Sequence, residues 1–366
     1  MSIPDFLIIG AGLTGATIAR DLTDSGARCI VVEKRATVAG NCHDQIHTPS
    51  GIRYHTYGPH LFRTKSQAIW DYVQRFADFY EYRHQVKTWV NGNWENWPVS
   101  GECIARLCGG DSKPALADDG TPAENFRIAS LRKMPAAIYE SFIKNYTEKQ
   151  WSARDTDLGA ELAGRFHIAQ DNDPHLHPQH RFQGLPRNGF TAMVAAMLDG
   201  IDVVLNVDGL ERRADFPAKH TIYTGPIDRF FGAKYGELKY RGQRYEREHL
   251  TGCAGFYQPA TVCNYPNDYD FVRITEWKRL AEDPLSGALR GTLLTREYPF
   301  FPTDPDEFAY PFPDKANRVL AERYLSDAEK LKDVTFCGRL GRYCYYDMDQ
   351  AIADARSVAE RAARRG

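Results

Sequence analysis

The sequence FLIIGAGLTGATIARDLTDSGARCIVVE, residues 6–33, decides the fold. A short apolar run leads into glycines at Gly10, Gly12 and Gly15, and a helix-like stretch then precedes a second apolar run that ends at Glu33. This order predicts a strand, a tight turn, a helix and a parallel strand. Glycines at such a turn let the backbone approach a pyrophosphate, whose charge is stabilised by free N–H groups at the start of the helix. The stretch therefore predicts a dinucleotide site in which Glu33 binds ribose hydroxyls and would repel a 2′-phosphate.

The residues that follow Glu33 narrow the choice of dinucleotide. Lys34 and Arg35 come next, and Gly40 and Asn41 then form a second glycine turn. This continuation differs from a plain NAD-binding fold and resembles FAD-binding oxidoreductase domains, so the resemblance implies FAD. The cofactor-binding residues predicted in this part of the chain are Gly10, Gly12, Leu13, Thr14, Gly15, Glu33, Lys34, Arg35, Gly40 and Asn41.

Composition argues against several other classes of protein. The 366 residues include 46 Lys and Arg against 48 Asp and Glu, a balance that lacks the basic excess of a nucleic-acid-binding protein. No run of about 18 apolar residues indicates a membrane helix, and no basic region precedes the first apolar run. We therefore expect a cytoplasmic protein without membrane insertion. The eight cysteines are scattered and form no CxxC pair, which argues for reduced thiols and against structural zinc.

The rest of the chain divides into helical and β-rich parts. Helix-like patterns dominate from about 65 to 170, and short β-like runs dominate from about 200 to 300. We predict an α/β protein in which a discontinuous Rossmann-like FAD-binding domain carries an inserted helical domain and an antiparallel β-sheet domain. The predicted segments are a first FAD-binding part (1–75), a mainly helical substrate and lid domain (76–170), a return to the FAD domain (171–210), the antiparallel sheet domain (211–320) and the C-terminal FAD-binding part (321–366).

Further stretches carry a resemblance that covers nearly the whole chain. They read YHTYGPHLFR (54–63), YTEKQW (146–151), YTGPID (223–228), FVRITEWK (271–278), REYP (296–299) and GRLGRYCYYDM (338–348). In order and spacing they resemble the bacterial UDP-galactopyranose mutases. The resemblance implies an isomerase that interconverts the pyranose and furanose forms of UDP-galactose, using reduced FAD without net redox change. In the implied mechanism, N5 of the reduced flavin forms a covalent adduct with the sugar while UDP leaves and later returns.

The resemblance also implies roles for individual residues. Arg165 and Arg273 would act in catalysis by gripping the leaving diphosphate with permanently charged guanidinium groups. His60 and Arg63 would also act in catalysis, from a loop that lies against the flavin. The further cofactor-binding residues that the resemblance implies are His60, Arg339, Asp347 and Met348. The implied substrate-binding residues are Phe142, Tyr146, which would stack on uracil, Trp151, Asn96, Tyr310, Tyr345 and Asp347.

Arg63 departs from the family pattern, in which histidine is common at this position. A guanidinium there can donate hydrogen bonds to an acetamido carbonyl or fill the space of a missing hydroxyl. The alternative substrate is therefore a 2-acetamido or deoxy nucleotide sugar. A flavin oxidoreductase of the amine-oxidase type is a further alternative, which only the N-terminal quarter supports. An inactive nucleotide-sugar-binding scaffold is the third.

A second departure is PHLHPQH, residues 174–180, which is longer than the corresponding region of better-known members and is expected on the substrate side. His175, His177 and His180 lack a carboxylate or cysteine at convincing ligand spacing, so we predict no metal site. The partners that the resemblance implies are a UDP-sugar substrate, a reductant such as NAD(P)H, and a second copy of the chain in a homodimer. No nucleic-acid partner is expected.

Overall fold

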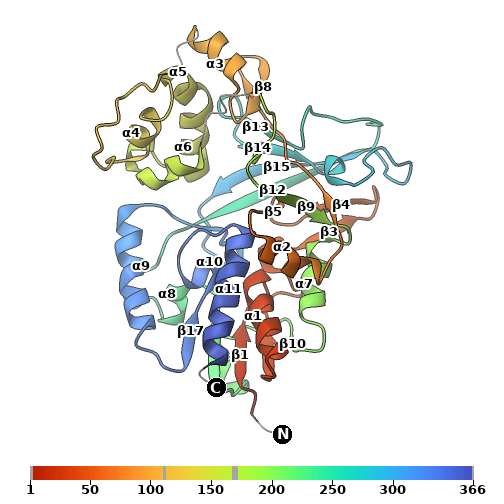
Figure 1. Ribbon diagram of the computed structural model, residues 1–366, viewed down its shortest axis with the longest axis vertical. Coiled ribbons are helices and arrows are strands. Elements are labelled where there is room, and N and C mark those ends of the chain that lie inside the picture. Colours follow the sequence, from red (N-terminus) through yellow and green to blue (C-terminus); the bar gives the residue numbers. More distant parts are fainter. Residues whose placement is uncertain (1–2, 110–112, 167–171, 365–366) are drawn as a thin grey trace.

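A parallel sheet forms the lower half of the molecule in Figure 1, with both chain ends at its base. The structure is a computed structural model and describes residues 3–109, 113–166 and 172–364. The strand order is β10-β2-β1-β11-β17, and all neighbours are parallel. These strands are β1 (Phe6–Ile9), β2 (Cys29–Val32), β10 (Asp202–Val204), β11 (His220–Tyr223) and β17 (Val334–Phe336). The predicted βαβ unit is confirmed, because α1 (Leu13–Asp24) connects β1 to β2.

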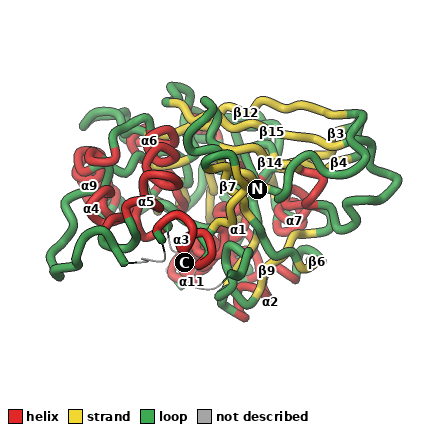
Figure 2. Tube along the Cα trace, turned by 90° about the horizontal axis from the view of Figure 1, so that it is seen from above, coloured by secondary structure: helices red, strands yellow, loops and turns green. Residues whose placement is uncertain are grey.

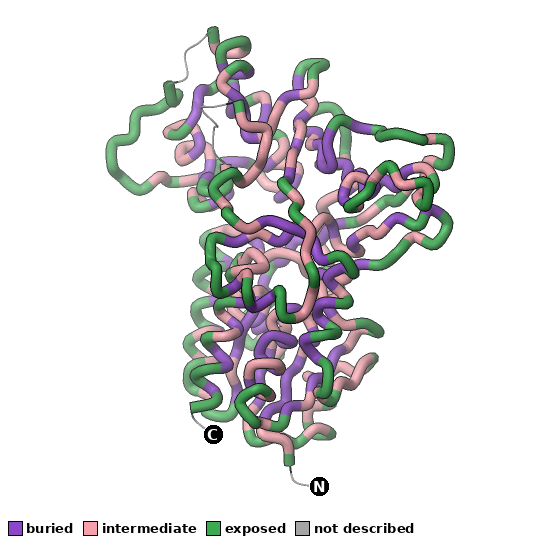
Figure 3. Tube along the Cα trace, turned by 45° about the vertical axis from the view of Figure 1, so that its right-hand side comes forward, coloured by how far each residue is buried: buried purple, intermediate pink, exposed green. Residues whose placement is uncertain are grey.

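Helices cover both faces of this sheet. In β1, Phe6 and Ile8 enter the core formed with α1, whereas Leu7 and Ile9 enter the core on the opposite face. Burial of both faces explains why the strand is continuously apolar rather than alternating. Figure 3 shows the buried residues running through the sheet and the inner sides of its helices. The helices of the first face are α1, α7 (Gly189–Met197) and α11 (Met348–Ala363), and those of the second are α8 (Ile227–Phe230) and α9 (Lys315–Ala328).

A seven-stranded sheet lies above the parallel one, in the order β16-β12-β15-β14-β13-β7-β8. All its neighbouring strands are antiparallel except β13 and β7. Figure 2 shows β12, β15 and β14 running side by side. The strands are β7 (Val86–Val90), β8 (Asn93–Trp97), β12 (Tyr240–Leu250), β13 (Val262–Asn264), β14 (Arg273–Glu276), β15 (Thr292–Phe300) and β16 (Tyr310–Pro311).

Smaller elements connect the two sheets. A three-stranded sheet has the order β5-β9-β6, and β3 pairs with β4 in a separate hairpin. Their bounds are β3 (Asp44–His47), β4 (Ile52–His55), β5 (Phe62–Thr64), β6 (Phe79–Glu81) and β9 (Phe182–Pro186). The helices α2 (Gln67–Gln74) and α10 (Gly338–Gly341) both lie next to α11.

A group of short helices lies at one end of the seven-stranded sheet (Figure 1). Its elements are α3 (Gly101–Cys108), α4 (Phe126–Leu131), α5 (Ala136–Ile138), a π-helical stretch (Tyr139–Lys144), α6 (Asn145–Trp151) and a 3-10 helix (Ala160–Arg165). Two cations attach α6 to the sheet. Arg241 of β12 is fully buried and donates to the Gln150 carbonyl (2.8 Å) and to Ser152 Oγ (2.9 Å) at the end of α6. Lys149 Nζ donates to the carbonyl oxygens of Tyr265 (2.8 Å) and Phe271 (3.2 Å).

The predicted fold class is confirmed, but several strands belong to a different sheet from the one predicted for their segment. β7 and β8, in segment 76–170, belong to the seven-stranded sheet, and β11, in segment 211–320, belongs to the parallel sheet. β9, in segment 171–210, pairs with β5 and β6 instead. Local periodicity indicates that a segment is a strand without indicating its partner, which explains these shifts. The boundary between 170 and 171 lies outside the described residues. Among the helices that the structure describes, none has the length and apolarity needed to cross a membrane.

Candidate active site

A first cavity lies at the carboxyl ends of β1, β2 and β11. Ile9, Val32 and Tyr223 end these strands and line it, together with the glycine loop and the start of α11. Every residue predicted to bind the cofactor lines this one cavity, including His60, Arg339, Asp347 and Met348 from distant parts of the chain. In open parallel sheets, ligands bind outside the carboxyl ends of the strands. We call this space the cofactor cavity.

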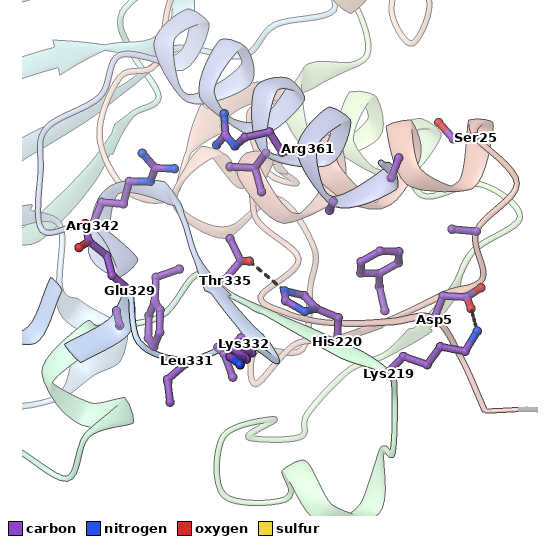
Figure 4. A pocket seen from close by; sticks show the side chains of 18 of the residues that line it. Asp5, Ser25, Lys219, His220, Glu329, Leu331, Lys332, Thr335, Arg342 and Arg361 are labelled. Carbon is purple, nitrogen blue, oxygen red and sulfur yellow. Dashed lines mark hydrogen bonds and ion pairs between the residues drawn. The ribbon is translucent and has the colours of Figure 1, made fainter. Parts of the chain in front are cut away.

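Another cavity, of about 1110 Å³, is larger but lies at the opposite edge of the sheet. Figure 4 shows it beside the amino ends of β1 and β11, where Lys219 pairs with Asp5 and His220 contacts Thr335. It contains neither the glycine loop nor the residues of the quoted motifs from 54 to 63 and 271 to 278. Size alone therefore does not identify the site, and the position at the carboxyl ends of the strands decides for the cofactor cavity.

The glycine loop of the cofactor cavity requires glycine on steric grounds. Gly10 has φ +110°, and a Cβ at this position would lie 2.1 Å from Thr224 Oγ1. A Cβ on Gly15 would lie 1.9 Å from the Gly10 carbonyl oxygen. Gly12 is the N-cap of α1 and brings no side chain to the first turn, so the N–H groups of that turn are open to a ligand. The loop fits a diphosphate group.

Glu33 is held in place on the wall of the same cavity. Its side chain is buried and accepts hydrogen bonds from the backbone N–H groups of Ala11 (2.8 Å) and Arg35 (2.9 Å). A carboxylate oxygen has more than one lone pair, so each oxygen can still accept a hydrogen bond from a ribose hydroxyl. Gly40 approaches the loop so closely that a Cβ on it would lie 3.0 Å from Gly12 Cα. These contacts fit a dinucleotide, and the residues present therefore suit FAD.

His60 is a neutral imidazole beside the cofactor cavity. Burial lowers its pKa to about 4. Its Nδ1 lies 2.8 Å from the Gly58 carbonyl, an acceptor only, so Nδ1 carries the proton and Nε2 is an acceptor. The backbone N–H of His60 in turn donates to His55 Nδ1 (2.9 Å). The His60 side chain thus presents a hydrogen-bond acceptor and carries no positive charge at neutral pH.

The depressed pKa of His60 predicts a specific loss of stability in acid. The unfolded chain protonates this histidine below about pH 6.5, whereas the folded chain does so only near pH 4. The unfolded state therefore binds more protons between these values, and stability falls as the pH decreases, by up to about 1.4 kcal/mol per pH unit for one such group. Urea unfolding at pH 6.5 and pH 5 should show a clearly smaller loss in His60→Asn than in the wild type. A Gln179→Ala control, at an exposed position without a titratable side chain, should keep the wild-type pH dependence of stability. A loss of stability in His60→Asn equal to that of the wild type would contradict the assignment.

A second cavity adjoins the first and is lined by the seven-stranded sheet, the helical group and the loop before β5. Asp347 lines both cavities, so the two spaces meet at the start of α11. We call the second space the substrate cavity. The predicted catalytic and substrate-binding residues that line it are Arg63, Phe142, Tyr146, Arg273, Tyr345 and Asp347.

Arg273 brings a permanent positive charge to the substrate cavity. Its Nε lies 3.3 Å from Oε2 of Glu297, which is almost fully buried on β15. Burial opposes the charge on Arg273, but Glu297 and the phenols of Tyr146 and Tyr310 outweigh it, so the pKa of Arg273 is raised. Burial also raises the pKa of Glu297, and the Arg273 charge acts in the opposite direction. Arg273 thus remains a cation that Glu297 holds in position.

Arg63 forms an ion pair with Asp347 at the junction of the two cavities. Its Nη2 lies 2.7 Å from Asp347 Oδ2, and Tyr345 donates to the other oxygen of the same carboxylate (3.2 Å). Arg165 stacks on the Tyr345 ring, with its guanidinium carbon 3.8 Å from the ring centre. Tyr310 stacks on the same ring at 6.0 Å. Arg165 and Tyr310 are therefore brought to the edge of the site through Tyr345.

Among the described residues, three predicted substrate-binding residues, Trp151, Asn96 and Tyr310, line neither cavity. Trp151 is 5% exposed and packs edge-on against Phe312 in the core of the helical group. Asn96 accepts a hydrogen bond from Lys87 across β7 and β8. Neighbouring residues on a strand face opposite sides, and Trp97 is the one that lines the substrate cavity. Direct substrate contacts of Trp151 and Asn96 are therefore not supported.

Several polar residues of the substrate cavity were not predicted from the sequence. His84, Thr88, Gln183 and Asn264 all line it. His84 is buried, its Nδ1 has no hydrogen-bond partner among the described residues, and burial, with Arg63 and Arg273 nearby, lowers its pKa to about 3. Val86 and Thr88 are two residues apart on β7 and therefore lie on the same face of the strand, which is its buried face. Only the pairing of β7 with β13 reveals which cavity that face lines.

The glycine loop on a parallel sheet, with an adjoining cavity that contains arginines and tyrosines, defines an enzyme with a flavin-type dinucleotide domain. A sequence profile of NAD(P)-binding Rossmann-like domains matches residues 8–76, and one described as UDP-galactopyranose mutase matches residues 141–345. The chain belongs to the UDP-galactopyranose mutase family, whose members are isomerases.

Individual relatives and solved structures agree with this assignment. The chain is 33% identical over 373 residues to the probable UDP-galactopyranose mutase of Klebsiella pneumoniae, across 98% of this chain and 95% of the relative. It is 28% identical over 371 residues to the dTDP-fucopyranose mutase of Escherichia coli, across 97% of each chain. A crystal structure of reduced UDP-galactopyranose mutase superposes with a TM-score of 0.78 at 16% identity, over 99% of this chain and 96% of that one. The last likeness establishes a common fold.

Proposed function

We propose that this chain binds FAD in the cofactor cavity and a UDP-sugar in the substrate cavity, and interconverts the pyranose and furanose forms of UDP-galactose. The observation that carries this proposal is that the two cavities meet at Asp347. A sugar in one cavity and a flavin in the other would therefore be neighbours. Reduced FAD supplies a nucleophilic ring nitrogen that can bond to the anomeric carbon of a sugar.

The residues of the cofactor cavity would orient the flavin without redox chemistry of their own. The first turn of α1 would hold the diphosphate through its N–H groups, and Glu33 would accept hydrogen bonds from the ribose. Neutral His60 would offer Nε2 as an acceptor at the flavin. Asp347 is the N-cap of α11, and its backbone N–H donates to Gln350 Oε1 (2.9 Å), which fixes the first turn of that helix beside both cavities. Arg339 and Met348 complete the proposed wall.

The residues of the substrate cavity would bind the nucleotide and hold the leaving group. Arg273, held by Glu297, and Arg165, stacked on Tyr345, are the proposed ligands of the diphosphate. Guanidinium suits this role because it is planar, permanently charged and able to bind two oxygens at once. Tyr310 and Tyr345 would add phenol donors without charge. Phe142 and Tyr146 would supply the aromatic wall for uracil.

Arg63 supports a second candidate substrate, a nucleotide sugar altered at carbon 2 or lacking a hydroxyl. Its guanidinium pairs with Asp347 at the junction of the cavities, where the sugar would lie. The E. coli relative is named for a different sugar and a different nucleotide, so sugar identity varies among related sequences. A bidentate donor at this position can bind an acetamido carbonyl while remaining paired with the carboxylate.

Arg63→His should change the preference between two substrates. We expect the ratio of kcat/KM for UDP-2-acetamido-2-deoxygalactose to that for UDP-galactose to fall by about tenfold, which corresponds to one lost charged hydrogen bond of about 1.4 kcal/mol. Chromatography of each reaction measures the ratio directly. Arg181→His is the control, because Arg181 stacks on Phe182 outside the cavity. An unchanged ratio would remove the 2-acetamido alternative and leave UDP-galactose as the proposed substrate.

An oxidoreductase of the amine-oxidase type makes a different prediction for the oxidised protein. Such an enzyme would reduce its flavin when substrate is added without oxygen, and the visible flavin absorbance would bleach. The mutase proposal expects the absorbance of the oxidised flavin to persist with UDP-galactose. A reductant such as NAD(P)H and a homodimeric state stay predictions from the family resemblance, and a cytoplasmic location stays a prediction from the sequence composition.

A further inference from the structure

The segment 173–180, which we call the His–Pro segment, forms part of the substrate cavity. Leu176 and His177 line this cavity. The His175 ring is turned toward Asp173, with Nδ1 2.6 Å from Oδ1. Among the described residues, no group of three or more histidines, cysteines or acidic residues is placed to hold a metal ion. The segment therefore forms one wall of the substrate cavity.

Hydrogen bonds fix this wall on both sides. The Leu176 N–H donates to the His84 carbonyl (2.8 Å), and an isolated antiparallel bridge joins His175 to Gln85. On the other side, Gln183 Nε2 donates to the carbonyl oxygens of His177 (2.8 Å) and His180 (3.0 Å). His84 and Gln183 themselves line the cavity. A connection whose backbone groups are paired in this way is an ordered part of the site.

The His–Pro segment lies at the end of the substrate cavity that meets the cofactor cavity, where the sugar would bind. Gln183 on β9 is the direct neighbour of Arg63 on β5, and Arg63 pairs with Asp347 where the two cavities meet. The aromatic side chains proposed for uracil, Phe142 and Tyr146, come instead from the helical group. A side chain of the His–Pro segment that enters the cavity is thus placed nearer to the sugar than to the base.

We propose that His177, supported by the rest of the His–Pro segment, sets the size of the sugar that the site admits. The inference rests on the proposed function, because it takes the ligand to be a UDP-sugar. An imidazole ring and an acetamido group are of similar size, so removing the ring opens space for a bulky substituent. A larger ring at position 177 would close this space. The nucleotide end is unaffected by either change.

Equilibrium binding to the FAD-loaded, oxidised protein tests this without turnover. Isothermal titration would compare UDP, UDP-galactose and UDP-2-acetamido-2-deoxygalactose with the wild type, His177→Ala and His177→Phe. We expect His177→Ala to shift the affinity ratio toward the acetamido sugar by about tenfold, within the range for filling or emptying a small apolar volume, and His177→Phe to shift it the other way. Affinity for UDP alone should stay within about twofold. Gln179→Ala, at an exposed position of the same segment, is the matched control and should leave the ratio unchanged.

The outcomes separate the two proposals. An unchanged ratio in both His177 variants, with UDP-sugar binding intact, would overturn the role of the wall and leave the mutase proposal standing. A loss of UDP affinity equal to the loss of UDP-sugar affinity would also overturn it, because the segment would then belong to the nucleotide end. A wild-type protein that binds UDP-sugars no more tightly than an unrelated sugar would reject the proposed function itself.

Discussion

Replacing Arg273 by alanine is expected to lower kcat/KM by a factor of about a hundred to a thousand, the usual effect of removing one charged group that stabilises a developing negative charge. The leaving diphosphate would lose a cation that is held in place by Glu297. Steady-state kinetics with the reduced protein measures the effect. Arg273→Lys keeps the charge but loses the planar fork, so we expect an intermediate loss.

The same substitution should also destabilise the fold, and this effect must be separated from the loss of activity. Glu297 is almost fully buried and would be left without its cation, at a cost of about 3 to 5 kcal/mol. The double variant Arg273→Ala with Glu297→Gln removes both charges and should recover stability but not activity. Arg244→Ala, at an exposed position of β12, is the control for a surface arginine. Activity within about threefold of wild type in a folded Arg273→Ala protein would contradict the assignment.

Gly15→Ala is expected to abolish flavin uptake. The added methyl group would lie 1.9 Å from the Gly10 carbonyl oxygen and 3.3 Å from Ile8 Cγ2, so α1 would have to move away from β1. Movement of α1 takes its first-turn N–H groups away from the diphosphate position. We expect a loss of more than about 3 kcal/mol in stability and a flavin content near zero, measured as the ratio of visible to ultraviolet absorbance.

Gly287→Ala is the matched control for this change. A Cβ on Gly287 has no described atom within 4 Å outside its chain neighbours, so stability and flavin content should stay at wild-type values. If Gly15→Ala retained full flavin content and wild-type stability, the close packing of the glycine loop against α1 would be wrong. The comparison therefore distinguishes a local steric requirement from a general sensitivity to glycine substitution.

The residues that local signals in the sequence assign to the cofactor line one cavity. Gly10, Gly15 and Glu33 could be assigned without a structure because their roles depend on a turn between adjacent elements. Only glycine avoids the clash with Thr224 and the Gly10 carbonyl, and a carboxylate at the end of β2 necessarily lies beside that turn. The family resemblance then added residues from the distant loop at His60 and from the start of α11, and the structure brings them to the same cavity.

The substrate cavity was harder to predict because it depends on pairing between distant strands. Thr88 and Asn264 are brought to it by the parallel pairing of β7 with β13, a contact that no local pattern reveals. Trp151 illustrates the opposite error. The resemblance implies that Tyr146 and Trp151 both bind the substrate, but Tyr146 lines the cavity while Trp151 packs against Phe312 in the helical core. The π-helical stretch before α6 further alters which residues share a face.

In the proposed reaction, a reduced flavin and a UDP-sugar react in two adjoining cavities with no net redox change. The most direct test is to incubate the FAD-loaded protein with UDP-galactofuranose, once reduced by dithionite and once oxidised, and to follow both isomers by chromatography. We expect conversion to UDP-galactopyranose by the reduced protein, with little or none by the oxidised protein. Equal conversion in both states, or no conversion of this sugar and of its 2-acetamido and deoxy counterparts by the reduced protein, would contradict it.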